Sequence, residues 1–260
     1  MVQQNFYYAD SNGNDFIVIF KHQLIVDLDT PMIKSLCKLK DKLVDGLLLI
    51  DNNIKGCDFK MDYYNNDGTW ETMCVNGALC AINILDRMKF SFSYNCFQAG
   101  DGIHNIKFSN NQIYIKMITP KFKMDDIELH GICGSYIDSG AKHFVLINNI
   151  LDNDKLYRLA QKIRYDNRFQ PDGLNVNFLH IIDSNHINVI TYEKGIENIM
   201  QSCGSGSVAS AFYAAFKQPL SSPLYVLNRG GKFTIEFNKS WDNVWIGGRP
   251  FPPKLLDVDL

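Results

Sequence analysis

The sequence has no long hydrophobic run and no excess of charge of one sign. Its 260 residues carry 26 Lys and Arg against 28 Asp and Glu, a formal net charge of −2 at pH 7. This balance provides no basic surface for nucleic acid or anionic lipid, and no apolar stretch approaches the roughly 20 residues of a membrane-spanning helix. Residues 1–5 also lack the basic and apolar regions of a secretory signal. We therefore expect a cytoplasmic protein that binds neither nucleic acid nor a membrane.

The cysteines form neither a disulfide framework nor a metal site. There are 7, an odd number, scattered along a chain too large to need disulfide bonds for a stable core. No CxxC pair occurs, and no nearby histidine joins Cys74 and Cys80 to complete a zinc site. These absences indicate free thiols in a reducing compartment and no bound metal.

The residues that are present indicate a globular mixture of strands and helices, with 46% hydrophobic content. Short runs rich in β-branched and aromatic residues predict strands at 16–20, 46–50, 112–116, 143–147, 175–179, 188–192 and 232–236. Helical spacing of apolar residues predicts helices at 31–42, 78–88, 156–163 and 207–216. The segment 120–129 is polar and irregular, so we expect the seam between two similar halves there.

Two short segments repeat one another. Residues 73–78 read MCVNGA and residues 202–207 read SCGSGS, so each places a cysteine ahead of a Gly-containing turn that leads into a predicted helix. The first N–H groups of a helix have no internal partner and carry partial positive charge, which favours a thiolate and lowers the thiol pKa from about 8.5. The same amides could hold a substrate carboxylate. If the fold brings the turns together, Cys74 and Cys203 can move a proton between the faces of one carbon. The alternative is that each is a small buried hydrophobic residue.

Further segments resemble the diaminopimelate epimerase family. Residues 11–16 (SNGNDF) resemble its Gly-x-Gly-Asn-Asp-Phe motif, 63–68 (YYNNDG) its Phe-Asn-x-Asp-Gly segment, 140–143 (GAKH) its Gly-Asn-Pro-His, 192–195 (YEKG) its Tyr-Glu-Arg-Gly and 202–206 (SCGSG) its Ala-Cys-Gly-Thr/Ser-Gly. Residues 175–178 (NVNF) match the family directly. Each motif alone is weak, but the set occurs in the family's order along nearly the whole chain.

The resemblance implies an α+β fold of two pseudo-symmetric lobes, each a mixed, mostly antiparallel sheet or barrel around a central helix. Residues 1–120 would form the lobe with Cys74 and residues 121–246 the lobe with Cys203, with 247–260 returning to the first lobe. Family members are commonly homodimers, and we expect the same here.

The resemblance also implies the chemistry. One cysteine, as thiolate, removes the α-proton of a small-molecule substrate, an amino acid, and the other, as thiol, protonates the opposite face. The family uses neither pyridoxal phosphate nor a metal. The catalytic residues would be Cys74 and Cys203. The substrate-binding residues would be Asn14, Asn65, Val75, Asn76, Gly77, His143, Asn175, Glu193, Lys194, Gly204 and Ser205.

Without the resemblance, these residues have simpler interpretations. Asparagines in Gly-rich segments are more often turn formers than ligands. His143 at the start of a predicted strand is more often structural, and Glu193 with Lys194 would form a solvated strand end.

Several positions depart from the family pattern. Lys194 replaces the arginine that holds the distal carboxylate of diaminopimelate, and lysine keeps the charge but lacks the bidentate geometry. Ala141 replaces an asparagine at the same end, Val75 a glycine and Leu79 an arginine. The catalytic pair is therefore intact while the substrate stays open. The chain is predicted to be a diaminopimelate epimerase; the alternatives are an epimerase or racemase of another amino acid on the same fold and a non-catalytic binding protein.

Overall fold

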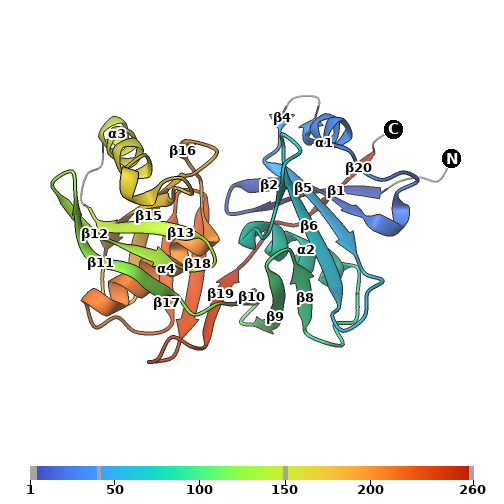
Figure 1. The fold of residues 1–260 in the computed structure, drawn as a ribbon. Helices are drawn as coiled ribbons and strands as arrows, with labels where there is room; N and C mark the ends of the chain where they lie inside the picture. Colours follow the sequence, from blue (N-terminus) through green and yellow to red (C-terminus); the bar gives the residue numbers. More distant parts are fainter. Residues whose placement is uncertain (1–4, 40–41, 149–151, 258–260) are drawn as a thin grey trace. The chain divides into compact units, whose positions relative to one another are not determined.

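The chain folds into two compact units. A computed structural model describes residues 5–39, 42–148 and 152–257. Unit 1 comprises residues 1–115 and 248–260, and unit 2 comprises residues 116–247. The chain therefore leaves unit 1 once, forms unit 2, and returns to unit 1 at its C-terminal end (Figure 1).

Unit 1 is dominated by strands, with few helices. Its strands are β1 (Asn5–Ser11), β2 (Asn14–Phe20), β5 (Gly46–Asp51), β6 (Phe59–Asn65), β7 (Trp70–Glu71), β8 (Cys96–Ala99), β9 (Gly102–Ser109), β10 (Gln112–Met117) and β20 (Lys254–Asp257), with a separate short pair β3 (Lys38–Leu39) and β4 (Lys42–Leu43). Its helices are η1 (Lys21–Gln23), α1 (Thr30–Cys37) and α2 (Val75–Arg87).

Unit 2 also consists mainly of strands, with few helices. Its strands are β11 (Lys121–Leu129), β12 (Ile132–Asp138), β13 (Lys142–Ile147), β14 (Asn175–Ile181), β15 (His186–Glu193), β16 (Asn198–Ile199), β17 (Leu224–Asn228), β18 (Gly231–Phe237) and β19 (Val244–Gly248). Its helices are α3 (Asn153–Arg164), η2 (Asn167–Phe169) and α4 (Gly204–Lys217).

The two units share one strand order. In unit 1 the pairing runs β20-β1-β2-β5-β6-β8-β9-β10, and only the β2–β5 and β6–β8 pairs are parallel among the described residues. In unit 2 it runs β11-β12-β13-β14-β15-β17-β18-β19, and the corresponding β13–β14 and β15–β17 pairs are the parallel ones. This agreement confirms the predicted α+β fold of two similar, mostly antiparallel halves.

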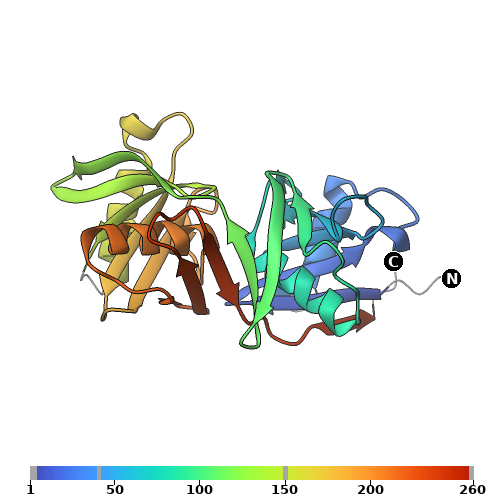
Figure 2. The ribbon, with the colours of Figure 1, turned by 90° about the horizontal axis from the view of Figure 1, so that it is seen from below.

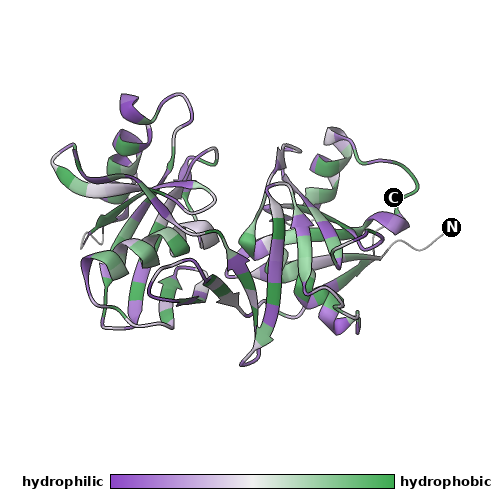
Figure 3. Cartoon of the chain, turned by 60° about the horizontal axis from the view of Figure 1, so that its bottom comes forward, coloured by the Kyte–Doolittle hydropathy of each residue, from purple (hydrophilic) through white to green (hydrophobic). Residues whose placement is uncertain are grey.

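One long helix lies against the sheet of each unit (Figures 1 and 2). Helix α2 packs on β1, β2, β5 and β6, and α4 packs on strands β12 to β15, β17 and β18. Almost every residue of α2 from Val75 to Leu85 is buried, whichever way it faces, so this helix is enclosed rather than amphipathic. Figure 3 shows hydrophobic and hydrophilic bands along many strands, as expected of sheets with one covered face. The N-termini of α2 and α4 are therefore held by their units' cores.

The predicted strands and helices are all present, although some bounds differ. The helix predicted at 31–42 ends at Cys37, where Lys38 leaves the helical region with φ −94° and ψ 80°, and residues 40–41 lie outside the described residues. The expectation of an irregular segment at 120–129 is wrong, because it contains β11. This strand is mostly exposed and its pairing with β12 shifts register around Met124, so it lacks the alternation that marks a strand in sequence.

Candidate active site

Cys74 caps the N-terminus of α2. Its backbone is extended, with φ −132°, and its Sγ accepts the N–H of Gly77 at 3.5 Å. The side-chain oxygen of Asn14, at the start of β2, lies 3.6 Å from Sγ and accepts the thiol proton. Asn76 in the first turn of α2 donates its Nδ2 to the same Asn14 oxygen at 3.4 Å. The structure thus brings together Cys74, Asn14, Asn76 and Gly77, as the motifs predict.

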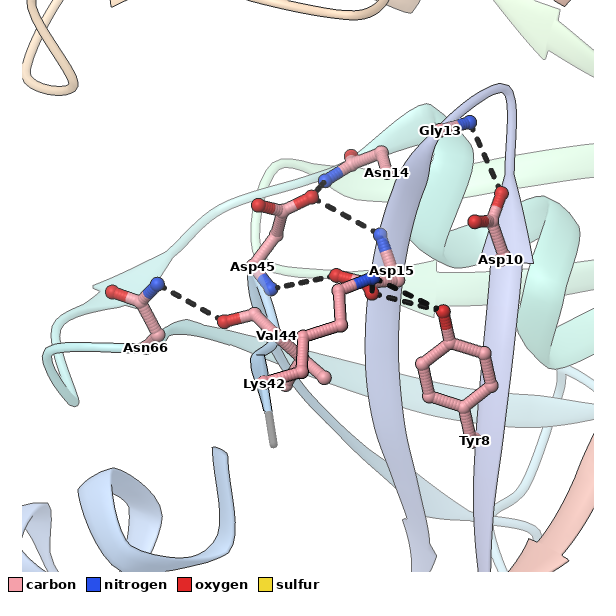
Figure 4. Close-up of polar contacts among 9 residues, drawn as sticks. All are labelled: Tyr8, Asp10, Gly13, Asn14, Asp15, Lys42, Val44, Asp45 and Asn66. Atoms are coloured by element: carbon pink, nitrogen blue, oxygen red, sulfur yellow. Dashed lines mark hydrogen bonds and ion pairs between the residues drawn. The ribbon is translucent and has the colours of Figure 1, made fainter. Parts of the chain in front are cut away.

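The Asn14 side chain is held from its other end by Asp45, which immediately precedes β5. Asn14 Nδ2 donates to Asp45 Oδ2 at 2.6 Å (Figure 4). Sequence reasoning missed Asp45, because an aspartate before a strand resembles an ordinary turn residue.

Two other residues of unit 1 that were predicted to bind substrate, Asn65 and Val75, have surroundings of their own. Asn65 ends β6, where its Oδ1 accepts the Tyr63 hydroxyl at 2.7 Å and its Nδ2 donates to the Thr69 hydroxyl at 3.0 Å. These contacts fix Asn65 to its own strand and the following turn. Val75 is the first residue of α2, and its side chain is buried in the unit.

Cys203 caps α4 in the same way that Cys74 caps α2. Its φ is −139°, and its Sγ accepts the N–H of Gly206 at 3.4 Å. The Ser205 hydroxyl lies 3.5 Å from the same sulfur. The two units therefore present the same local arrangement. In each, the sulfur of the cysteine before the helix accepts the backbone N–H of the residue three positions later.

A chain of side-chain hydrogen bonds in unit 2 leads to Ser205. The Thr191 hydroxyl donates to Asn177 Oδ1 at 2.8 Å, which leaves Asn177 Nδ2 to donate to His143 Nδ1 at 2.9 Å. His143 Nε2 then carries the proton and donates to Ser205 Oγ at 3.0 Å. Ser205 Oγ, having accepted this bond, can direct its own hydrogen to Cys203. His143 is thus bonded to Ser205, whose hydroxyl lies beside Cys203. Sequence reasoning missed Asn177 and Thr191.

His143 is neutral in this arrangement. The side chain is fully buried, and burial lowers its pKa from 6.5 to about 3. A neutral imidazole with Nδ1 accepting agrees with the hydrogen bond from Asn177.

The thiol of Cys203 differs from the expectation for a helix start. Burial raises its pKa well above the ordinary value, and the nearby Glu193 carboxylate acts in the same direction. Hydrogen bonds from Ser205 and from the Gly206 N–H lower the pKa but do not offset burial. The prediction of a lowered pKa is therefore wrong for Cys203 in this structure, because burial disfavours the charged thiolate.

The remaining predicted residues of unit 2 lie at the ends of β14 and β15. Asn175 begins β14, and its Oδ1 accepts the backbone N–H of Lys194 at 2.8 Å. Lys194 follows Glu193, the last residue of β15, and its Nζ donates to the backbone oxygen of Asp172 at 3.2 Å. The Asp172 carboxylate pairs with Lys142. Gly204 is buried in the first turn of α4.

Sequence comparison places the chain beside curated diaminopimelate epimerases. The protein of that name from Flavobacterium psychrophilum is 31% identical over 250 residues, which cover 93% of this chain and 95% of the relative. The chain belongs to the diaminopimelate epimerase family. A second member, from Chlorobaculum tepidum, is 28% identical over 242 residues, 91% of this chain and 94% of that one. The resemblance drawn from the motifs is confirmed, and the protein is an isomerase of the amino-acid epimerase and racemase class.

Solved structures with the same fold extend beyond the diaminopimelate epimerase family. A phenazine biosynthesis protein of the PhzF family from Bacillus anthracis matches with a TM-score of 0.71 at 14% identity, over 98% of this chain and 99% of that one. A hydroxyproline epimerase from Agrobacterium vitis matches with a TM-score of 0.68 at 12% identity, over 98% and 91%. No model of a known protein family matches the chain. These likenesses concern the fold.

Within residues 5–39, 42–148 and 152–257, no group of three or more His, Cys, Asp or Glu side chains is arranged to hold a metal ion. Over the same residues, none of the helices combines the length and apolar character that crossing a membrane requires.

The burial of neutral His143 predicts a pH-dependent stability of this epimerase-family chain. Between pH 6.5 and 5 the unfolded state binds a proton at this residue and the folded state does not. The contribution of His143 to the free energy of unfolding therefore falls by about 1.4 kcal/mol per pH unit as the pH is lowered. Chemical denaturation of His143→Gln should show a flatter dependence over that range, whereas the exposed His180→Gln should behave as the wild type. Equal slopes for His143→Gln and the wild type would contradict the assignment.

Proposed function

We propose that the enzyme interconverts LL- and meso-diaminopimelate by a two-base mechanism that uses Cys74 and Cys203 and no cofactor. The observation that carries this proposal is the equivalence of the two cysteines. Each caps the central helix of its unit, and each Sγ accepts the N–H of a glycine three residues onward, at 3.5 Å for Cys74 and 3.4 Å for Cys203. The names of the relatives support the substrate.

The chemistry requires strong stabilisation of the carbanion, because the α-proton of an amino acid is very weakly acidic. Preorganised N–H dipoles around the substrate carboxylate can supply it. Gly77 and Gly206 already direct their amides to sulfur. The earlier amides of each helix, at 75–76 and 204–205, are therefore the ones we assign to the carboxylate.

The side chains around the thiols have separate roles in this proposal. Asn14 and Asn76 would contact the substrate beside Cys74, and Asn65 and Asn175 would contact it from the strand ends, since an amide suits both ammonium and carboxylate. Glu193 would face the substrate ammonium. His143 donates to Ser205, so we assign it to positioning that hydroxyl rather than to direct proton transfer.

A second candidate keeps the chemistry and changes the substrate. The Lys194 ammonium is bonded to a backbone oxygen of Asp172, and Lys194 stands where the family has arginine. An ammonium cannot form the paired hydrogen bonds by which arginine holds a carboxylate. Together with Ala141, the lysine at this position favours an amino-acid substrate without a distal carboxylate.

Incorporation of solvent deuterium at Cα distinguishes the two substrates. In D2O with purified enzyme, we expect LL-diaminopimelate to exchange its α-proton and to yield the meso form. A panel of amino acids including proline, hydroxyproline, glutamate and lysine serves as the comparison. If diaminopimelate stays unlabelled while another member of the panel exchanges, the first substrate is wrong and the chemistry is retained.

We also propose that the enzyme acts in the cytoplasm as a homodimer. Both are expectations from the family, and size-exclusion chromatography with light scattering tests the second directly.

A further inference from the structure

We propose that Asp45 is a positioning residue for Cys74, because it fixes the side-chain amide of Asn14 with the oxygen, rather than the nitrogen, toward the thiol. The consequence for turnover rests on the proposed function, whereas the orientation of the amide does not.

The orientation follows from hydrogen-bond chemistry. Asp45 Oδ2 lies 2.6 Å from Asn14 Nδ2 and also accepts the backbone N–H of Asp15 at 3.1 Å (Figure 4). A carboxylate only accepts hydrogen bonds, so the end of the Asn14 amide that faces it must be the NH2 group. Rotating the amide by half a turn would place two oxygens in contact.

The other end of the amide then faces the catalytic thiol. Asn14 Oδ1 is 3.6 Å from Cys74 Sγ and 3.4 Å from Asn76 Nδ2. An acceptor beside sulfur stabilises S–H and disfavours S⁻. Asp45 thus keeps Cys74 in the form of a proton donor until substrate or a movement of Asn14 changes that contact.

Asp45 is itself held firmly. Its backbone N–H donates to Asp15 Oδ1 at 3.0 Å, so Asp15 and Asp45 each accept the other's main-chain amide. The Asp15 carboxylate also accepts the Tyr8 hydroxyl at 3.0 Å and pairs with Lys42. This cross-link lies where β2 and β5 begin their parallel pairing, with Phe16 opposite Gly46. The carboxylate that orients Asn14 is therefore tied to the start of the β2–β5 pair.

Several charged or titratable groups surround this cross-link and the thiol. The Asp15 carboxylate raises the pKa of Asp45, and the Lys42 ammonium lowers it; the same two groups act in the same directions on Asp10. The thiol of Cys80 is buried on α2. Removing the charge of Asp45 alone would therefore favour the Cys74 thiolate. The test must separate charge from hydrogen bonding.

Two substitutions at one position achieve that separation. Asp45→Asn removes the charge but can keep an oxygen where Oδ2 accepts both hydrogen bonds. Asp45→Ala removes the charge and the acceptor. Tyr8→Phe is the matched control, because it deletes a bond of the same cross-link and leaves the contacts of Asn14 intact. Thermal melts of all three establish that they are folded.

The first readout is the pH dependence of Cys74 alkylation by iodoacetamide, followed by peptide mass spectrometry in a Cys133→Ser/Cys203→Ser background. We expect the midpoint for Asp45→Ala to lie about half to one pH unit below that for Asp45→Asn. The midpoint for Tyr8→Phe should equal that of the parent. The second readout, with both catalytic cysteines present, is turnover. Asp45→Ala should lose about tenfold in kcat with a smaller change in KM, and Asp45→Asn should recover most of the loss.

Equal alkylation midpoints for Asp45→Ala and Asp45→Asn, in folded protein, would overturn the proposal. A shift in alkylation without any turnover on diaminopimelate would leave the positioning role standing and count against the proposed substrate. A tenfold loss of kcat in Tyr8→Phe would also overturn the proposal. The loss would then come from weakening the cross-link as a whole and not from the orientation of Asn14.

Discussion

Replacing Cys74 or Cys203 with serine is expected to lower kcat by roughly 10²- to 10⁴-fold in each case, the usual contribution of a positioned acid or base. Serine retains the size and can still accept the Gly77 or Gly206 amide that each sulfur accepts. Its hydroxyl, however, is far too weak an acid to shuttle protons at neutral pH. The loss should therefore appear in kcat more than in KM.

Each single variant should lose both directions of the reaction. With one cysteine missing, the proton can be removed from one face but not delivered to the other. Conversion of each isomer into the other should therefore fall, while substrate binding measured by calorimetry stays within a few-fold of the wild type.

Cys133→Ser supplies the control, since Cys133 is an exposed thiol on β12. It should keep wild-type turnover. A loss of turnover in this variant would mean that removing any thiol, and not Cys74 or Cys203 in particular, lowers activity. Full activity in either Cys74→Ser or Cys203→Ser would exclude the two-base mechanism.

The second large effect is expected from Gly206→Ala. A Cβ at this position would lie 2.7 Å from Asn177 Oδ1, 3.2 Å from Thr191 Oγ1 and 3.3 Å from Cys203 Sγ. Asn177 cannot withdraw easily, because it is bonded to Thr191 on one side and to His143 on the other. Either the thiol or the hydrogen-bond chain must move, and a displacement of this size at a reacting group costs about 10²-fold in rate.

Gly77→Ala is the matched comparison, since Gly77 occupies the same place after Cys74. Its Cβ would lie 2.8 Å from Leu48 Cδ2, the end of an apolar side chain that can change rotamer, and 3.5 Å from Cys74 Cβ. We expect a loss of stability of about 1 kcal/mol with a much smaller loss of kcat.

Steady-state kinetics and thermal melts of both glycine variants provide the measurement. Similar kinetic losses for Gly77→Ala and Gly206→Ala would show that the crowding of Asn177 is not the cause. A Gly206→Ala variant with activity within twofold of the wild type would show that the hydrogen-bond chain to Ser205 can shift without consequence.

Local sequence was sufficient to find the two cysteines. A thiol followed by a Gly-containing turn and a helix-forming run is a short, continuous signal, and its repetition distinguished Cys74 and Cys203 from the other thiols. Strands that are buried and rich in β-branched residues, such as β2, β5 and β14, were found for the same reason. Strand β11 was not, because an exposed and bulged edge strand buries too little apolar surface to leave an alternating pattern.

The partners of the proposed catalytic groups came only from the tertiary structure. Asn177 lies opposite Thr191 in the β14–β15 register, and His143 lies opposite Asn175 in the β13–β14 register. Asp45 reaches Asn14 across the parallel pairing of β2 and β5. Such contacts join residues far apart in the chain, and no local pattern encodes which side chains a sheet register places together.

The sequence by itself determined the family and reaction class of this protein, and it singled out the two cysteines to which we assign proton transfer, since both depend on short motifs. The tertiary structure decided the protonation and orientation of the groups around them. It made His143 neutral, raised rather than lowered the pKa of Cys203, and turned the Asn14 oxygen toward Cys74. The physical reason is that desolvation and hydrogen-bond direction depend on what surrounds a side chain in space, and strands distant in sequence supply those surroundings.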